Sequence, residues 1–227
     1  MWQIDFPHSL GLLYSAFTYF TGFKVNSGEY KLMGLAPYGE PKYADQILDS
    51  VIDLKADGSL AMDQRFFNYC QGLTMTGKRF DALFDGPPRQ PEAPITQREM
   101  DLAASIQLVT EKAVLQMAKT ARELTGMTKL CLAGGVALNC VANGKLLRSG
   151  IFEDIWIQPA AGDAGGALGG ALFTYFQLLD NERRAQRTDS MRGALLGPKF
   201  SDREIQTLLD VRGNCRALQL RPHLLHN

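Results

Sequence analysis

The sequence predicts an α/β fold organised around residues 129–171, a stretch that holds nine of the 22 glycines in the chain. Two segments within it, residues 130–147 and 154–170, each have the pattern of a short apolar strand, a turn of small residues and a helix. In the first segment the turn is Gly134-Gly135. Because both units run in the same order, as in a βαβ arrangement, we expect their glycine ends to point the same way.

The glycine ends of the two units are the candidate ligand site. Glycine lets the backbone approach an anion closely, and the first turn of a helix presents unpaired N–H groups. We expect Asn139 one turn into the first helix, where its amide can bind a ribose or phosphate. Asp163 stands at the mouth of the second unit, where a carboxylate suits a metal or its water. Neither unit matches a Walker loop or GxGxxG, so a tight turn or helix packing is the simpler alternative.

Residues 9–22 predict the first helix. Ser9 suits the N-cap position, Gly22 ends the pattern, and large apolar residues recur between them at helical spacing. These residues are Leu10, Leu13, Tyr14, Phe17 and Phe20. We interpret this aromatic stripe as core rather than as a cofactor site.

A second helix is predicted within residues 26–39. Glu29 suits its first turn, because a carboxylate is stabilised at the positive end of the helix dipole. Lys31 has no evident structural role, and a solvent-exposed lysine is its simplest interpretation.

A hairpin and two helices are predicted in the next part of the chain. Asp57-Gly58 is a turn signal between two short strands. The predicted elements are helices over residues 44–52 and 78–84 and strands over residues 52–54 and 59–62.

Residues 96–124 predict a long amphipathic helix that leads into the glycine-rich centre. Its start is marked by Thr96 and Glu99, which have the spacing of a capping box. Beyond the centre, the polar residues 180–189 indicate a solvated helix end or linker, and residues 201–210 predict a short helix.

Charge and composition argue against several classes of protein. The 24 basic and 24 acidic residues balance, which gives no electrostatic reason to expect nucleic acid or an acidic membrane as a partner. No apolar run reaches the roughly 18 residues of a membrane span, and no signal peptide opens the chain, so we expect a cytoplasmic protein. The four cysteines form no CxxC and are expected to be reduced core thiols. His223 and His226 form an HxxH without a nearby acid or cysteine, so we assign no metal site there.

Five short motifs occur along the chain. They are residues 6–11 (FPHSLG), 26–31 (NSGEYK), 33–39 (MGLAPYG), 134–139 (GGVALN) and 162–165 (GDAG). In sequence and order they closely resemble the O-carbamoyltransferases of nodulation-factor and antibiotic biosynthesis. The resemblance extends over residues 6–210.

The resemblance implies a nucleotide-binding domain of the actin, hexokinase and chaperone (ASKHA) superfamily, similar to the enzyme that threonylcarbamoylates tRNA. In that family, ATP and carbamoyl phosphate give a carbamoyladenylate, and the carbamoyl group passes to a hydroxyl of a small-molecule acceptor. A divalent metal, iron in the family, lies in the cleft. The implied site residues are Glu29, Gly134, Gly135 and Asn139 for the nucleotide, Lys31 for catalysis and Asp163 for the metal.

The chain also departs from the family pattern. The family's first lobe supplies a phosphate loop and a pair of metal-binding histidines, whereas the only early histidine here is His8. We therefore expect an interior piece, mainly the second lobe with part of the first. Residues 1–190 would form the nucleotide-binding domain without its N-terminal part, and residues 191–227 the start of a truncated C-terminal domain. The tail from Val211 does not resemble the family.

Several alternatives stay open. We expect little or no transferase activity from the chain by itself. A kinase-like ATPase on the same scaffold is one alternative, and a non-catalytic remnant or binding module is another. Homo-oligomerisation is compatible with the sequence, which does not indicate the acceptor or the metal.

Overall fold

The computed structural model describes residues 2–184 and 188–212. The chain divides into two compact units, Met1–Asn181 and Glu182–Asn227, which are described separately. The first unit combines helices with two small two-stranded sheets, so the α/β prediction is confirmed. Membership of the ASKHA superfamily and the domain limits at residues 190 and 191 stay predictions. Among the described helices, none is long and apolar enough to cross a bilayer.

The predicted helices and strands of the first unit are all found, with ends that shift by a few residues. The helices are α1 (Leu10–Phe20), α2 (Glu29–Leu35), α3 (Ala44–Gln46), α4 (Lys78–Leu83), α5 (Gln97–Thr125), α6 (Cys140–Arg148) and α7 (Gly165–Phe173). The strands are β1 (Ile52–Leu54), β2 (Leu60–Met62), β3 (Lys129–Leu132) and β4 (Asp154–Ile157). Short 3-10 or π turns join them: η1 (Ala36–Tyr38), η2 (Ile47–Val51), η3 (Gln64–Phe66), η4 (Gly135–Leu138) and η5 (Thr174–Leu178).

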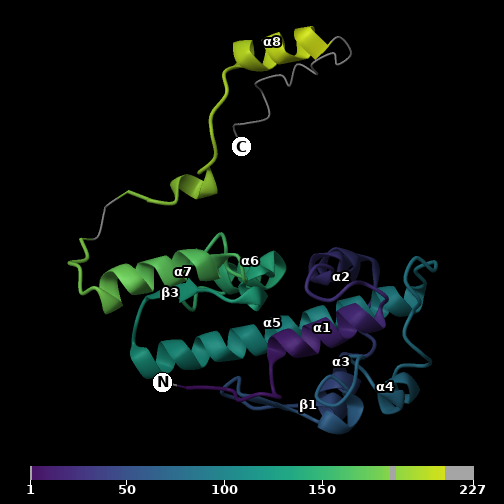
Figure 1. Cartoon of the computed structure of the whole chain (residues 1–227). Helices are drawn as coiled ribbons and strands as arrows, with labels where there is room; N and C mark the ends of the chain where they lie inside the picture. The colour runs from purple at the N-terminus through teal and green to yellow at the C-terminus, as the bar shows by residue number, and fades with distance from the viewer. Residues whose placement is uncertain (1, 185–187, 213–227) are drawn as a thin grey trace. The chain divides into compact units, whose positions relative to one another are not determined.

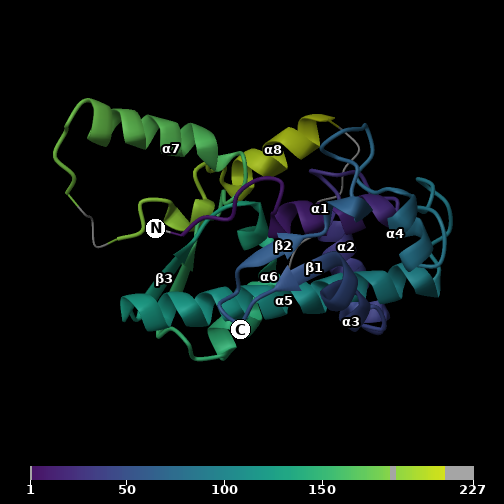
Figure 2. The ribbon, with the colours of Figure 1, turned by 90° about the horizontal axis from the view of Figure 1, so that it is seen from below.

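Helix α5 is the central element of this unit. In Figure 1 the β1–β2 hairpin, α3 and α4 lie on one side of it, and α2, α6 and β3 lie on the other. Figure 2 shows β1 and β2 side by side as the hairpin. Its first turn has the predicted capping box between Thr96 and Glu99, and its last turn ends at Gly126 in the left-handed conformation. The hairpin also forms as predicted, with Ile52 opposite Met62 in an antiparallel register.

An aromatic cluster fills the core between α1 and α4. Helix α1 begins at the predicted N-cap, where the Leu12 N–H donates to Oγ of Ser9 (3.2 Å). The rings of Phe17 and Phe20 are fully buried and meet the ring of Phe80 edge-on, with centroids 5.1 and 4.8 Å apart. The aromatic stripe is therefore core, as predicted.

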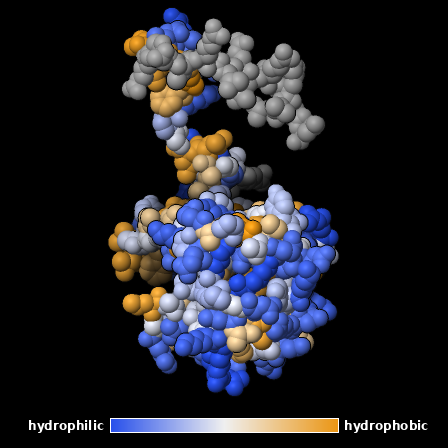
Figure 3. Space-filling model, turned by 90° about the vertical axis from the view of Figure 1, so that its right-hand side faces the viewer, coloured by the Kyte–Doolittle hydropathy of each residue, from blue (hydrophilic) through white to orange (hydrophobic). Residues whose placement is uncertain are grey.

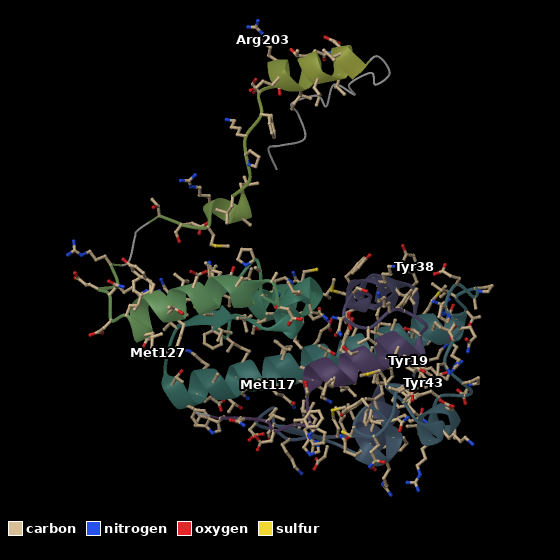
Figure 4. The ribbon with its side chains drawn as sticks, in the orientation of Figure 1. Tyr19, Tyr38, Tyr43, Met117, Met127 and Arg203 are labelled. Carbon is tan, nitrogen blue, oxygen red and sulfur yellow. The ribbon has the colours of Figure 1, made fainter. Side chains whose placement is uncertain are left out.

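The segment after α2 packs tightly against the start of α5. A Cβ added to Gly39 would lie 2.0 Å from the carbonyl oxygen of Met100, so only glycine fits between the two backbones. The preceding residue, Tyr38, is largely exposed at the surface of the unit (Figure 4). This part of the MGLAPYG motif therefore has a structural role.

A smaller core lies between β3–β4 and helices α5 and α6. Its buried residues are Ala118, Leu146 and Phe152, and alternate strand residues such as Leu130 and Ile155 pack against it. The opposite face of the two-stranded sheet is open, and Trp156 there is 46% exposed. The sheet is therefore covered on one face only, whereas parallel sheets are usually covered on both faces.

Helix α7 and the turn after it have no buried residue. They form one uncharged segment from residue 165 to residue 178. Several large apolar side chains on it are exposed: Leu172, Phe173, Tyr175 and Leu178. The end of the unit that carries α2 and α4, in contrast, has a mainly hydrophilic surface (Figure 3).

The second unit contains the 3-10 turn η6 (Arg192–Ala194) and helix α8 (Asp202–Arg212). Its described residues are almost all exposed. Helix α8 corresponds to the helix predicted over residues 201–210. The HxxH at His223 and His226 lies outside the described residues.

The expectation that the cysteines are core thiols was wrong for the cysteines that the structure describes. Cys70, Cys131 and Cys140 are free and exposed. Cys131 alternates with inward-facing residues of β3 and so lies on the open face of the sheet. Cys215 lies outside the described residues.

Candidate functional site

The two glycine turns meet at one edge of the β3–β4 sheet. The strands are parallel, with Lys129 opposite Asp154, so their carboxyl ends lie at the same edge. The Gly134 N–H donates to the carbonyl oxygen of Ala161 (2.7 Å), which joins the first turn directly to the second. The prediction that both glycine ends point the same way is confirmed. We call residues 134–139 the glycine loop.

The glycine end of the loop is open to solvent, whereas Ala137 and Asn139 are buried. Gly134 has φ 98°, a conformation that favours glycine, and leads into the 3-10 turn η4. Both Gly134 and Gly135 are exposed, and a Cβ added to either would meet no atom within 4 Å. A ligand can therefore approach this backbone without displacing a side chain.

Asn139 ends the glycine loop but directs its amide inward. The residue is 9% exposed, and its Oδ1 accepts from the Ala142 N–H (3.0 Å), which caps α6. The predicted continuous helix is therefore split here into η4 and α6. Oδ1 and Nδ2 of Asn139 also form a reciprocal pair with the amide of Gln107 on α5, at 3.1 and 2.9 Å. The side chain on which we expected a ligand contact is thus engaged within the protein.

Gln107 belongs to a buried polar network that the sequence did not reveal. Its Oε1 accepts from the Tyr14 hydroxyl (3.1 Å), and its Nε2 donates to Glu111 (2.9 Å). Lys145 on α6 forms a salt bridge with the other oxygen of Glu111. Burial, together with the charges of Glu111 and Glu29, raises the pKa of Tyr14 well above its usual range. The one sequence signal was the i, i+4 spacing of Gln107 and Glu111 among the core positions of α5.

Asn143, one turn further along α6, supports the same loop. It is buried, and its Nδ2 donates to the carbonyl oxygen of Ala137 (2.7 Å). Hydrogen bonds of two buried asparagines, Asn139 and Asn143, therefore fix the loop on its protein side, while its glycines face solvent.

Glu29 and Lys31 lie on α2, which the structure brings next to the end of the glycine loop. Sδ of Met33 is 3.9 Å from Sγ of Cys140, the first residue of α6. The Glu29 carboxylate is half-buried and accepts hydrogen bonds from Oγ of Ser15 and from two backbone N–H groups of its own turn. Lys31 is exposed and forms no ion pair with the described residues.

Asp163 lies in the second glycine turn, where its side chain is exposed. Within residues 2–184 and 188–212, no group of three or more His, Cys, Asp or Glu side chains is gathered as a metal site would require. His8 does not add a second metal ligand beside Asp163, because its Nδ1 accepts a hydrogen bond from the Met62 N–H (3.0 Å). Asp163 is thus a single carboxylate without further ligands among the described residues.

Two grooves, of about 460 and 380 Å³, lie along α3 and α5 rather than over the glycine turns. The larger is lined by polar residues that include Asp45, Asp49 and Lys112. The smaller is mainly apolar and is lined in part by Glu111 and Lys145 of the buried network.

Known proteins resemble this chain over most of its length. A family model described as the carbamoyltransferase N-terminus matches residues 1–172. The chain is 66% identical over 208 residues to the uncharacterized protein sll1178 of Synechocystis, covering 92% of this chain and 34% of that protein. It is 39% identical over 210 residues to nodulation protein NolNO of Sinorhizobium fredii, covering 92% of this chain and 29% of NolNO.

A further relative is nodulation protein NolO of Bradyrhizobium diazoefficiens, which is 40% identical over 196 residues, 86% of this chain and 34% of NolO. The chain spans about a third of the length of these curated relatives. The resemblance found in the sequence motifs is confirmed by the family match. The chain belongs to the carbamoyltransferase family, of which it carries the N-terminal family domain.

Proposed function

We propose that the chain forms the nucleotide-binding part of an ATP-dependent O-carbamoyltransferase. The donor would be carbamoyl phosphate, activated with ATP as a carbamoyladenylate, and the acceptor a hydroxyl of a small molecule. The observation that supports this most directly is the pair of hydrogen-bonded glycine turns at one sheet edge in a member of this family. Because the chain spans about a third of the length of its relatives, we assign full turnover to a protein of the relatives' length and little or none to the chain alone.

In this proposal the glycine loop and α2 form two walls of the ATP site. The exposed backbone of Gly134 and Gly135 would lie against the phosphates, since no side chain obstructs it. Lys31 would face the phosphates from α2, where its free ammonium can offset negative charge. Glu29 would shape that wall, and Asn139 would contribute by fixing the loop. Our reason for proposing the ASKHA fold is the resemblance of the sequence motifs to this family.

The transfer step needs a positioned hydroxyl and a stabilised leaving group. The acceptor oxygen forms a bond to the carbamoyl carbon, the bond from that carbon to the adenylate oxygen breaks, and the hydroxyl proton passes to solvent or a base as AMP leaves. The chain's contribution would be to bind the adenylate phosphate through Lys31 and through backbone N–H groups of the loop other than that of Gly134, which donates to Ala161.

A divalent metal does not fit the residues that the structure describes. A site for a divalent ion requires several oxygen or nitrogen ligands together, and Asp163 offers one exposed carboxylate. We therefore assign no step of the reaction to a metal held by this chain. Asp163 remains our candidate for a ligand that would act together with groups from elsewhere.

Calorimetric titration with ATP tests the proposed site. In Gly135→Asp, the new side chain has room in the free protein but places a negative charge over the loop, so ATP binding should weaken at least tenfold. Gly170→Asp is the matched control, since it adds the same charge at another open glycine, on α7. Equal affinity of the two variants, or a folded wild-type chain that does not bind ATP, would reject the proposed site.

The alternative of a binding module has one observation in its favour. Helix α7 is apolar on all sides yet has no buried residue, whereas helices of this composition are normally enclosed. A chain whose only role is to dock onto a partner through α7 would show this feature and would not bind ATP. The titration therefore separates the two functions.

A further inference from the structure

We infer that Gln107 is a positioning residue on α5 that sets the conformation of the glycine loop through direct contact with Asn139. The effect of this residue on ATP binding rests on the proposed function, whereas its effect on the conformation of the loop does not. Gln107 lies 32 positions before Asn139 in sequence and makes no part of the GGVALN motif.

The hydrogen-bonding capacity of Gln107 is fully used. A glutamine amide has two donor hydrogens and two acceptor lone pairs. Oε1 accepts from the Tyr14 hydroxyl (3.1 Å) and from Nδ2 of Asn139 (2.9 Å). Nε2 donates to Oε1 of Glu111 (2.9 Å) and to Oδ1 of Asn139 (3.1 Å). Since the side chain is 5% exposed, no water can replace these partners, and its rotamer is fixed.

This arrangement determines which way the Asn139 amide points. The reciprocal pair leaves Oδ1 of Asn139 directed at the Ala142 N–H, where it caps α6 (3.0 Å). The Asn139 backbone N–H donates to the Val136 carbonyl oxygen (2.9 Å) and closes η4. Gln107 therefore fixes the point at which the loop ends and α6 begins.

The hydrogen-bonded network around Gln107 includes side chains from three helices, so the loop is aligned with more than one element. Tyr14 is on α1, Glu111 is on α5, and Lys145, which pairs with Glu111, is on α6. Without Gln107, Asn139 and Glu111 would each lose a buried partner, and the loop could adopt other conformations without breaking the rest of the core. A ligand that binds the loop would then select one conformation among several, which lowers its apparent affinity.

The test combines amide hydrogen exchange with ATP titration of the full chain. Gln107→Met keeps the side-chain volume and removes all four hydrogen bonds, and Gln107→Ala is the shorter companion variant. Gln116→Ala is the matched control: it removes a half-buried glutamine of the same helix whose Oε1 has no hydrogen-bond partner among the described residues.

We expect the amides of Ala137, Asn139 and Ala142 to exchange roughly tenfold faster in Gln107→Met than in the control, while α1 amides change little. ATP affinity should fall by a similar factor at a temperature where both variants are folded. Loop exchange and ATP affinity equal to those of Gln116→Ala, with only a lower melting temperature, would overturn the inference. If the wild-type chain binds no ATP, the proposed function fails, and the exchange rates alone decide the positioning role.

Discussion

Asp101 is predicted to be the main polar anchor between the start of α5 and the segment after η1. Its side chain is 5% exposed. Oδ1 accepts from the Glu40 N–H and from Nε2 of Gln97, and Oδ2 accepts from Nζ of Lys42, each at 2.8 Å. Removal of the carboxylate would leave the Glu40 N–H without its partner at the joint where Gly39 meets α5.

We expect Asp101→Ala to lower the free energy of unfolding by about 3 kcal/mol. Hydrogen bonds to charged groups contribute about 1.5–3 kcal/mol each but are not additive, and the half-exposed Lys42 regains water when its partner is lost. For a chain of this size the melting temperature should fall by roughly 6–12 °C. Asp101→Asn keeps the volume and one acceptor oxygen, so its effect should be smaller. Urea unfolding followed by circular dichroism measures both variants.

The effect of Asp101 should also depend on pH. Burial raises the pKa of Asp101, but the hydrogen bonds from the Glu40 amide, Lys42 and Gln97 outweigh it, so the pKa lies below its usual value. A lowered folded-state pKa adds stability that is complete above the unfolded-state value of about 3.9 and is lost as the pH falls through the folded-state pKa. The difference between wild type and Asp101→Asn should therefore shrink below pH 4.

Asp53→Ala is the control, since it removes a carboxylate whose ion pair with Lys55 is largely exposed. It should change the stability little. Equal losses for Asp101→Ala and Asp53→Ala, or a difference between wild type and Asp101→Asn that grows in acid, would refute the reasoning.

Three further variants test the fold. Gly39→Ala should destabilise the chain by about 2 kcal/mol or more, because the new methyl group overlaps the α5 backbone. Gly34→Ala, in open space within α2, should instead stabilise the chain by about 0.5 kcal/mol. Equal melting temperatures of the two variants would contradict this. Phe80→Ala should cost about 3–5 kcal/mol in urea unfolding, since the ring is fully buried among other aromatic rings, and a loss below 1 kcal/mol would contradict the core assignment. Phe173 and Leu178 are exposed, so the double variant Phe173→Ser with Leu178→Ser should bind less hydrophobic dye and associate less with itself in light scattering. Unchanged dye binding and scattering would show that α7 does not promote association.

Local signals were sufficient to predict most of the first unit. The caps at Ser9 and Thr96 and the hairpin turn at Asp57-Gly58 depend on residues a few positions apart, and each is found as predicted. The parallel arrangement of β3 and β4 followed from the repeated order of strand, small residues and helix.

The buried side of the site could not be predicted in the same way. The bond between Tyr14 and Gln107 joins residues 93 positions apart, and the pair formed by Glu111 and Lys145 spans 34 positions. Such contacts depend on how α1, α5 and α6 pack, which no local spacing records. For this reason the sequence predicts a ligand contact at Asn139 but does not reveal the hydrogen bonds of its amide with Gln107.

The central claim is that the two glycine turns form one ligand surface. Amide chemical shifts of the isotope-labelled chain, recorded while ATP is added, test it directly. The account predicts shifts that saturate together at Gly134 and Gly135 in the first turn and at Gly162 and Gly165 in the second, because the turns are joined through Gly134 and Ala161. Saturating shifts confined to the grooves along α3 and α5, or no shifts in a folded chain, would contradict it.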